Sequence, residues 1–279
     1  MQINTEFSCN AVILISSPRI GEEGTPRRIS EDLETLANSK EKFFFRHLSI
    51  STQGDLLTTL KKIEHEASKG LRPILHFDMH GNQTKGLELG VSGEMISWET
   101  LVEHLRPINI KTNNNLMIFI TACYGMNLIK PITIFKPTPF FGLIAPKKSI
   151  KVWDIENGAA PFFTELMESG RLDLAYNKLS SLFTNFNSEK MLVISMAKYI
   201  REQCKGRGGM ERRERLLTES LTSSNIENNR TNRKLIRKQI KQFIMPDQTL
   251  LDKYAHTFLM GNSCSVTIRQ IEKELKKTN

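Results

Sequence analysis

The stretch RPILHFDMHGN (residues 72–82) is an apolar run that ends in a histidine followed at once by a glycine. A short, continuous apolar run of this kind is typical of a strand that is buried on both faces, as in a parallel sheet. A second stretch, NLMIFITACYGMN (115–127), has the same form and leads to Cys123. The sequence therefore predicts two buried strands, each with a reactive side chain, His80 or Cys123, at its end.

Strand-like and helix-like segments alternate around these two runs. Further strands are predicted over residues 11–16, 42–50 and 140–146. Helical spacing of apolar residues and capping residues predict helices over 29–38, 52–70, 96–108 and 158–170. This alternation predicts an α/β fold with an open, mostly parallel sheet of about six strands, helices on both faces, and a C-terminal helical extension.

The composition changes towards the C-terminus, which predicts a first domain over 1–195 and a basic, mainly helical extension over 196–279. The net charge is +9, and residues 201–241 alone hold 12 Lys and Arg against 5 Asp and Glu. The polar segment CKGRGGMERRERLLTESLTSSNIENNRTN (204–232) predicts a mobile linker that is open to cleavage. Two stretches beyond the Gly/Arg-rich part, 233–245 and 268–277, predict basic helices.

The basic extension has several expected roles. A positive surface can attract nucleic acid or an acidic protein surface. No aromatic residue lies among these charges to stack bases, so a solvated helical face is favoured over nucleic-acid binding. The extension is also expected to dock a regulatory protein partner, or to block or complete an active site. The alternative is that it only packs on the core and adds stability.

Cysteine usage and hydropathy bear on the cellular compartment. The four cysteines (Cys9, Cys123, Cys204 and Cys264) lie far apart and form no CxxC pair, which favours a reducing compartment. No apolar run approaches the ~18 residues of a transmembrane helix. The N-terminus lacks the basic leader of a secretory signal. We therefore expect a cytoplasmic protein without a membrane partner.

The two strand ends predict a site for nucleophilic chemistry. Ligands in open α/β sheets bind at the carboxyl ends of the strands, where His80 and Cys123 would lie as neighbours. The histidine can take the proton of the thiol and later give it to a leaving amine. The backbone N–H groups of Gly81 and Cys123 could donate to a developing oxyanion. In an inactive form the two side chains can be farther apart than a hydrogen bond.

A second hypothesis uses the alternation of His76, Asp78 and His80, which places all three on one face of the predicted strand. Two histidines and one carboxylate could hold a metal with a position open for water, as in a metal-dependent hydrolase. The other four histidines are scattered and add no cluster. We therefore expect no metal and no cofactor. Asp78 is expected to make a structural hydrogen bond or to orient His80.

Two motifs resemble those of a known group. HFDMHGN resembles the His-Gly signature of caspase-like (clan CD) cysteine peptidases, and FITACYG resembles their Ala-Cys-x-Gly signature. The group includes caspases, metacaspases and bacterial CHAT peptidases, and residues 142–179 are most similar to the CHAT-type branch. The resemblance covers about residues 10–185. It implies a caspase-hemoglobinase fold and a cysteine endopeptidase acting on a protein substrate, with His80 as general base and acid and Cys123 as nucleophile. A non-catalytic binding or regulatory protein with the same fold remains the alternative.

The resemblance also implies a substrate pocket near the first and fifth strands. Caspases use arginines to hold an acidic residue, and Arg19 follows the first strand. Metacaspases hold a basic residue with an aspartate two places before the cysteine, where this chain has Thr121. Asp154 and Glu156 follow the fifth strand and could also hold a basic residue. The residue preference stays open on these grounds.

Overall fold

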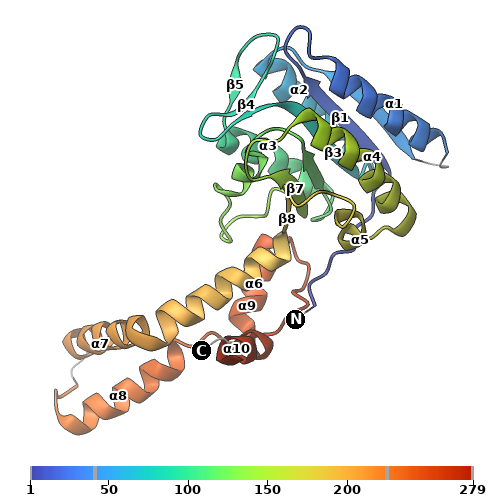
Figure 1. The fold of residues 1–279 in the computed structure, drawn as a ribbon. Helices are drawn as coiled ribbons and strands as arrows, with labels where there is room; N and C mark the ends of the chain where they lie inside the picture. The colour runs from blue at the N-terminus through green and yellow to red at the C-terminus, as the bar shows by residue number, and fades with distance from the viewer. Residues whose placement is uncertain (1, 40–42, 224–225, 278–279) are drawn as a thin grey trace. The chain divides into compact units, whose positions relative to one another are not determined.

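The computed structural model describes residues 2–39, 43–223 and 226–277 (Figure 1). The chain divides into two compact units. The α/β unit spans Asn4–Ser188, and the helical unit comprises the described part of 189–279 with the N-terminal residues 2 and 3. The division falls after Ser188, whereas the sequence suggested residue 195.

The α/β unit contains one mixed sheet. Its main path has the order β2-β1-β3-β6-β7-β8, with bounds Phe44–Ser49 for β2, Ala11–Ser17 for β1, Pro73–Asn82 for β3, Met117–Ile120 for β6, Gly142–Pro146 for β7 and Phe183–Asn187 for β8. Neighbours along this path are parallel, except that β8 is antiparallel to β7. The predicted α/β class with a mostly parallel sheet is confirmed. Residue 42 of the predicted second strand lies outside the described residues.

A small hairpin branches from the end of β3 and was not predicted. Its strands are β4 (Gly86–Glu88) and β5 (Met95–Ile96). β4 is antiparallel to the last residues of β3, with His80 opposite Glu88 and Gly81 opposite Leu87. Strands of three and two residues are too short to give a periodic apolar pattern, which is why the sequence did not reveal them.

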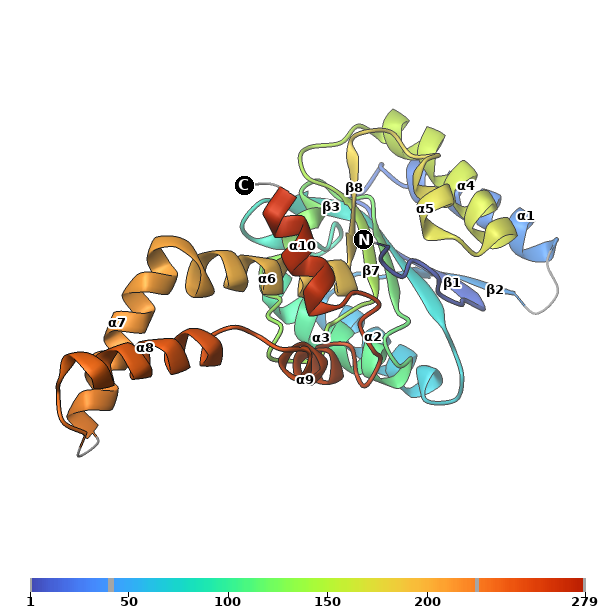
Figure 2. The same ribbon diagram turned by 90° about the horizontal axis from the view of Figure 1, so that it is seen from below.

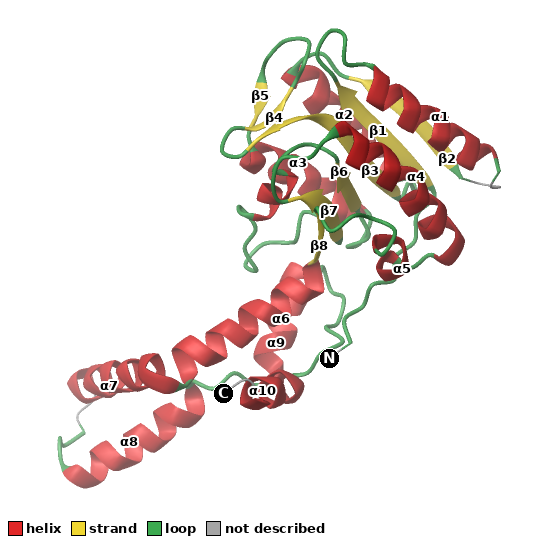
Figure 3. Cartoon of the chain, in the orientation of Figure 1, coloured by secondary structure: helices red, strands yellow, loops and turns green. Residues whose placement is uncertain are grey.

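Helices cover both faces of the sheet (Figures 2 and 3). One face carries α1 (Gly24–Asn38), α4 (Val152–Ser169) and the short α5 (Leu172–Tyr176), and the other carries α2 (Gln53–Ala67) and α3 (Trp98–Lys111). Alternate residues of β1 explain this layering, because successive side chains of a strand point to opposite faces. Val12 and Leu14 belong to the cluster that includes Leu33 of α1 and Phe162 of α4. The predicted two-sided cover is confirmed.

The helical unit begins in α6 (Ser188–Tyr199) and continues through the π-helical turn η2 (Ile200–Cys204), α7 (Gly206–Ser223), α8 (Arg230–Phe243), α9 (Gln248–Phe258) and α10 (Ile268–Lys277). The two basic helices predicted over 233–245 and 268–277 are confirmed as α8 and α10. In the described part of the chain, no helix is long and apolar enough to cross a membrane.

The segment predicted as a mobile linker, 204–232, is largely the helix α7, so that prediction was wrong. Leu216, Leu217 and Leu221 of α7 pack with Ile236, Ile240 and Ile244 in and after α8. This narrow apolar stripe lies among many charged residues. They make the mean hydropathy of the segment low, so the sequence did not reveal the helix. The glycines near the start of α7 have a packing role, because a Cβ at Gly208 would overlap the carbonyl oxygen of Glu202. Residues 224 and 225 of the segment lie outside the described residues.

Candidate functional site

The carboxyl ends of β3 and β6 bring His80 and Cys123 to one place. The two strands are parallel neighbours, in register from Ile74 opposite Met117 to Phe77 opposite Ile120, so both run to the same edge of the sheet. His80 lies near the end of β3, and Cys123 follows β6. Both residues line one cavity of about 320 Å³. The structure therefore joins the two predicted reactive side chains in a single site.

Gly81 explains why a glycine follows the histidine. A Cβ atom built on Gly81 would overlap the carbonyl oxygen of Cys123 and would come within 3.1 Å of the Ala122 side chain. Only a residue without a side chain allows the end of β3 to lie directly against the loop that carries Cys123. The His-Gly pair is thus a requirement of the close approach between the two strand ends.

The loop after β6 holds Cys123 in a strained turn. The half-buried Cys123 accepts a hydrogen bond at Sγ from the backbone N–H of Ile150, at 3.4 Å. The next residue, Tyr124, has a φ of 60°, in the left-handed region that non-glycine residues seldom adopt. Its N–H donates to the carbonyl of Lys148, which helps to fix the turn. Non-glycine residues held in such conformations are concentrated at functional sites.

The 3-10 helix η1 (Gly125–Ile129) follows the turn that carries Cys123. Of the two N–H groups proposed for an oxyanion, that of Cys123 enters no hydrogen bond of the described residues, so it is available to a ligand. Gly81 lies opposite Leu87 in the pairing of β3 with β4. Gly81 is not among the residues that line the cavity, whereas Cys123 is.

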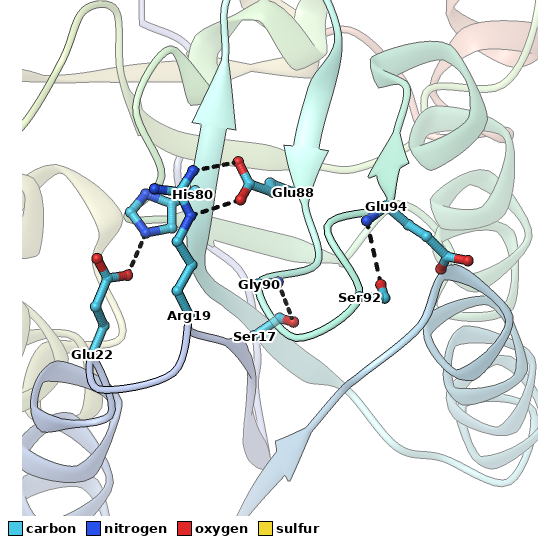
Figure 4. Close-up of polar contacts among 8 residues, drawn as sticks. All are labelled: Ser17, Arg19, Glu22, His80, Glu88, Gly90, Ser92 and Glu94. Carbon is cyan, nitrogen blue, oxygen red and sulfur yellow. Dashed lines mark hydrogen bonds and ion pairs between the residues drawn. The ribbon is translucent and has the colours of Figure 1, made fainter.

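The ring of His80 is bound by a carboxylate that the sequence did not reveal. Its Nε2 lies 2.5 Å from Oε2 of Glu22, in the loop between β1 and α1 (Figure 4). This hydrogen bond to His80 lowers the pKa of Glu22. Within the described ranges no hydrogen bond joins His80 to Cys123. Nothing in SPRIGEEGTPRR distinguishes Glu22 from its neighbour Glu23.

In the part of the chain that the structure describes, Asp78 is hydrogen-bonded to Thr121 and not to His80. The hydroxyl of Thr121 donates to Oδ1 of Asp78 at 2.8 Å. Burial raises the pKa of Asp78, and the hydrogen bond from Thr121 partly opposes this effect. Of the two roles expected for Asp78, the structure shows the structural hydrogen bond. The carboxylate in contact with the His80 ring belongs to Glu22.

The metal-binding set of the second hypothesis is not formed. The ring of His76 lies in the core, with its centroid 4.8 Å from that of Phe119 and 5.7 Å from that of Phe163. Its Nε2 lies 3.2 Å from the hydroxyl of Thr121. Among the residues that the structure describes, no group of three or more His, Cys, Asp or Glu side chains is arranged to hold a metal ion. Alternation along β3 places the three side chains on one face, but His76 and Asp78 both contact the hydroxyl of Thr121, whereas His80 contacts Glu22.

The burial of His76 predicts a strong dependence of stability on pH. Burial lowers its pKa to about 3, whereas the unfolded chain titrates near 6.5. The unfolded state therefore binds the proton first, and stability is lost as the pH falls from about 6.5 to about 3. The difference between these two pKa values corresponds to roughly 5 kcal/mol in the free energy of unfolding. His76→Phe keeps a ring beside Phe119 and should therefore unfold at a lower pH than the wild type, as measured by circular dichroism.

The matched control for this acid unfolding is His65→Gln, because His65 is exposed on α2. Its acid transition should coincide with that of the wild type. If His76→Phe also unfolds at the wild-type pH, the neutral buried imidazole does not govern acid stability.

The three residues predicted for a substrate pocket have different surroundings. Arg19 donates to both carboxylate oxygens of Glu88, at 2.7 and 2.8 Å, and does not line the cavity. Its guanidinium is thus engaged within the protein, in contrast to the role suggested by the sequence. Arg28 lines the cavity and donates to Glu156 at 2.7 Å. The structure does not bring the three predicted pocket residues, Arg19, Asp154 and Glu156, together at the cavity.

The two predicted acids lie in the first turns of α4. Glu156 forms the ion pair with Arg28, and its other oxygen, Oε1, is buried without a hydrogen-bond partner in the described structure. Asp154 is half-buried and lies outside the cavity wall. The acidic residues that line the cavity are Asp78 and Glu22, which lies in the loop after β1.

None of the other three cysteines is among the residues that line the cavity. Burial raises the pKa of Cys9 to about 11, and burial is also the main cause that raises the pKa of Cys264 to about 11. Burial raises the pKa of Cys204 as well. A thiol with a raised pKa is poorly ionised at neutral pH and is a poor nucleophile. Cys123 is therefore the cysteine whose position suits reaction with a ligand.

Neither protein-family models nor curated proteins yield a match to this chain. The chemical interpretation of the site therefore depends on the arrangement of its residues.

Proposed function

We propose that the protein is a cysteine endopeptidase of the caspase-like group, nearest to its bacterial CHAT-type branch. Cys123 is the nucleophile, and His80 is the general base and acid. The observation that carries the proposal is that both side chains line one cavity at the carboxyl edge of the sheet, with Gly81 against the backbone of Cys123. A protein is the proposed substrate, and the cytoplasm the proposed location.

The order of elements supports this proposal. The chain passes through β1, a helix, β2, a helix and then β3 with its His-Gly pair. A helix, β6 with the cysteine, β7 and another helix follow. This is the succession that the resemblance to caspase-like peptidases implies. The hairpin β4–β5 is an addition between the histidine and the next helix.

The proposed reaction uses the groups at the cavity in turn. His80 accepts the proton of Cys123, and the thiolate attacks the carbonyl carbon of the scissile peptide bond. The N–H of Cys123 donates to the oxyanion that forms. His80 then protonates the leaving amine, and water hydrolyses the thioester to release the acid and the free thiol. Catalytic hydrogen bonds that are long in the free enzyme tighten when substrate binds.

The test is cleavage of a denatured protein mixture by the purified full-length chain, with new N-termini identified by mass spectrometry. Cleavage should be abolished by iodoacetamide, because alkylation removes the thiol. It should persist in a chelator. Cleavage that survives alkylation and stops with the chelator would instead support the metal-dependent hydrolase. Binding of a protein without cleavage would support the non-catalytic alternative.

Regulation by the helical unit, or by a protein partner bound to it, is a further part of the proposal. A chain ended at Ser188 should differ from the full-length protein in its cleavage rate while it still melts cooperatively. Equal rates and equal partner binding for the two chains would refute a regulatory role.

A further inference from the structure

We infer that Glu22 is the third member of the site, a positioning residue that holds the His80 ring through Nε2 and leaves Nδ1 to receive the proton of Cys123. The inference rests on the proposed function and adds to it a residue that no motif of the sequence marks. It is based on the contact between His80 and Glu22 and on the hydrogen bonds that fix the loop and the hairpin around this contact.

The contact itself fixes the state of the histidine ring. Nε2 of His80 and Oε2 of Glu22 are 2.5 Å apart. The pKa of Glu22 is lowered, so the carboxylate is ionised at neutral pH and can only accept a hydrogen bond. Nε2 must then carry the ring proton, and in a neutral imidazole Nδ1 is left as the acceptor. Nδ1 is therefore the nitrogen that can act as a base.

The loop that carries Glu22 is tied to the strand that carries His80 (Figure 4). The N–H of Glu22 donates to the carbonyl of Arg19 at 3.0 Å, and the Arg19 guanidinium binds both oxygens of Glu88. Glu88 lies opposite His80 in the pairing of β3 with β4. The contacts thus form a closed ring through His80, Glu88, Arg19 and Glu22, which holds the carboxylate beside the imidazole.

The β4–β5 hairpin supports the same loop at a second point. The N–H of Gly90 donates to the carbonyl of Ser17 at 3.2 Å and to its hydroxyl at 3.0 Å. A Cβ on Gly90 would overlap the backbone of Pro18, so the hairpin lies directly on the start of the loop. The unpredicted hairpin therefore helps to fix the position of Glu22 relative to His80.

A role in stability alone does not explain this arrangement. The side chains of His80 and Glu22 are 40% and 48% exposed. Exposed ion pairs of this kind contribute little to the free energy of unfolding, because solvent screens them. A merely structural pair therefore predicts no effect of substitution, whereas a positioning role predicts a loss of catalytic rate at unchanged stability.

The experiment compares Glu22→Gln and Glu22→Ala with Glu23→Gln, which removes the neighbouring charge in the same loop. The amide of glutamine can still accept from Nε2–H, whereas alanine cannot. We expect kcat to fall about tenfold for Glu22→Gln and about 100-fold for Glu22→Ala, with KM and melting temperature unchanged. Glu23→Gln should stay within about twofold of the wild type.

The second readout is the ¹⁵N spectrum of the His80 ring in the full-length protein, which does not depend on catalysis. The neutral ring should be protonated at Nε2 in the wild type and should lose this preference in Glu22→Ala. Unchanged kcat or an unchanged tautomer in Glu22→Ala would overturn the inference. If the wild type cleaves nothing, the peptidase proposal fails. The tautomer and the alkylation rate of Cys123, which should fall in Glu22→Ala, then decide the role of Glu22 by themselves.

Discussion

Cys123→Ala and His80→Ala are each expected to lower the rate of peptide cleavage by about three orders of magnitude or more. The thiol supplies the nucleophile, and the imidazole, which lines the same cavity, supplies the general base of the proposed mechanism. Because the two groups act as one unit, removal of the second adds little once the first is lost. The double variant should therefore be almost as active as the less active single variant, in steady-state assays with one peptide substrate.

Two controls come from the same chain. Cys9→Ala removes a thiol whose pKa burial raises to about 11, and His65→Ala removes an exposed histidine on α2. Neither residue lines the cavity, so both variants should keep wild-type cleavage rates. Full activity in Cys123→Ala would show that another nucleophile is at work. A double variant whose loss equals the product of the single losses would show that the two residues act independently.

Gly81→Ala has the second largest expected effect, because the added methyl group would overlap the carbonyl oxygen of Cys123. That oxygen belongs to the backbone, so relief requires the end of β3 or the Cys123 loop to move. Overpacking of this kind typically destabilises a protein by about 1–3 kcal/mol. The same movement separates His80 from Cys123, and misplacement by about 1 Å can lower a rate by about 100-fold. We therefore expect a lower melting temperature together with a cleavage rate reduced by about 100-fold.

The matched control is Gly54→Ala in the first turn of α2. A Cβ there would have Thr52 Oγ1 as its nearest neighbour, at 3.8 Å, which is an ordinary contact. Alanine also favours helix more than glycine does. Gly54→Ala should keep its cleavage rate and melt at or slightly above the wild-type temperature. If Gly81→Ala behaves in the same way, the close approach of the two strand ends is not needed for the reaction.

The sheet was predictable because its central strands are buried on both faces. β1 is buried along its whole length, and β3 is buried from Pro73 to Met79. β1 is continuously apolar from Ala11 to Ile15, and apolar residues flank the polar His76 and Asp78 of β3. β8 was not predicted, because its sequence FTNFN carries only two strongly apolar residues. The helix α7 was missed for a related reason, since its few leucines, which pack with isoleucines in and after α8, are surrounded by charged residues.

The site was predictable only where it coincides with strand ends. His80 and Cys123 follow apolar runs, and parallel strands bring their carboxyl ends to one edge. Glu22 lies on a loop whose shape depends on the ion pair of Arg19 with Glu88, 69 positions along the chain. Because Glu88 belongs to the unpredicted hairpin, Arg19 looked free to bind substrate. Long-range polar contacts of this kind leave no periodic pattern in a sequence.

The most direct test of the central claim, that His80 activates Cys123, is the rate at which iodoacetamide alkylates each of the four cysteines. Peptide mass spectrometry of the folded wild type and of His80→Ala at pH 7 would measure all four rates in one sample. We predict that Cys123 reacts fastest in the wild type and at least about tenfold more slowly in His80→Ala. Cys9 and Cys264 should react slowly and equally in both proteins. A Cys123 that reacts no faster than these two, or at the same rate without His80, would contradict the proposed site.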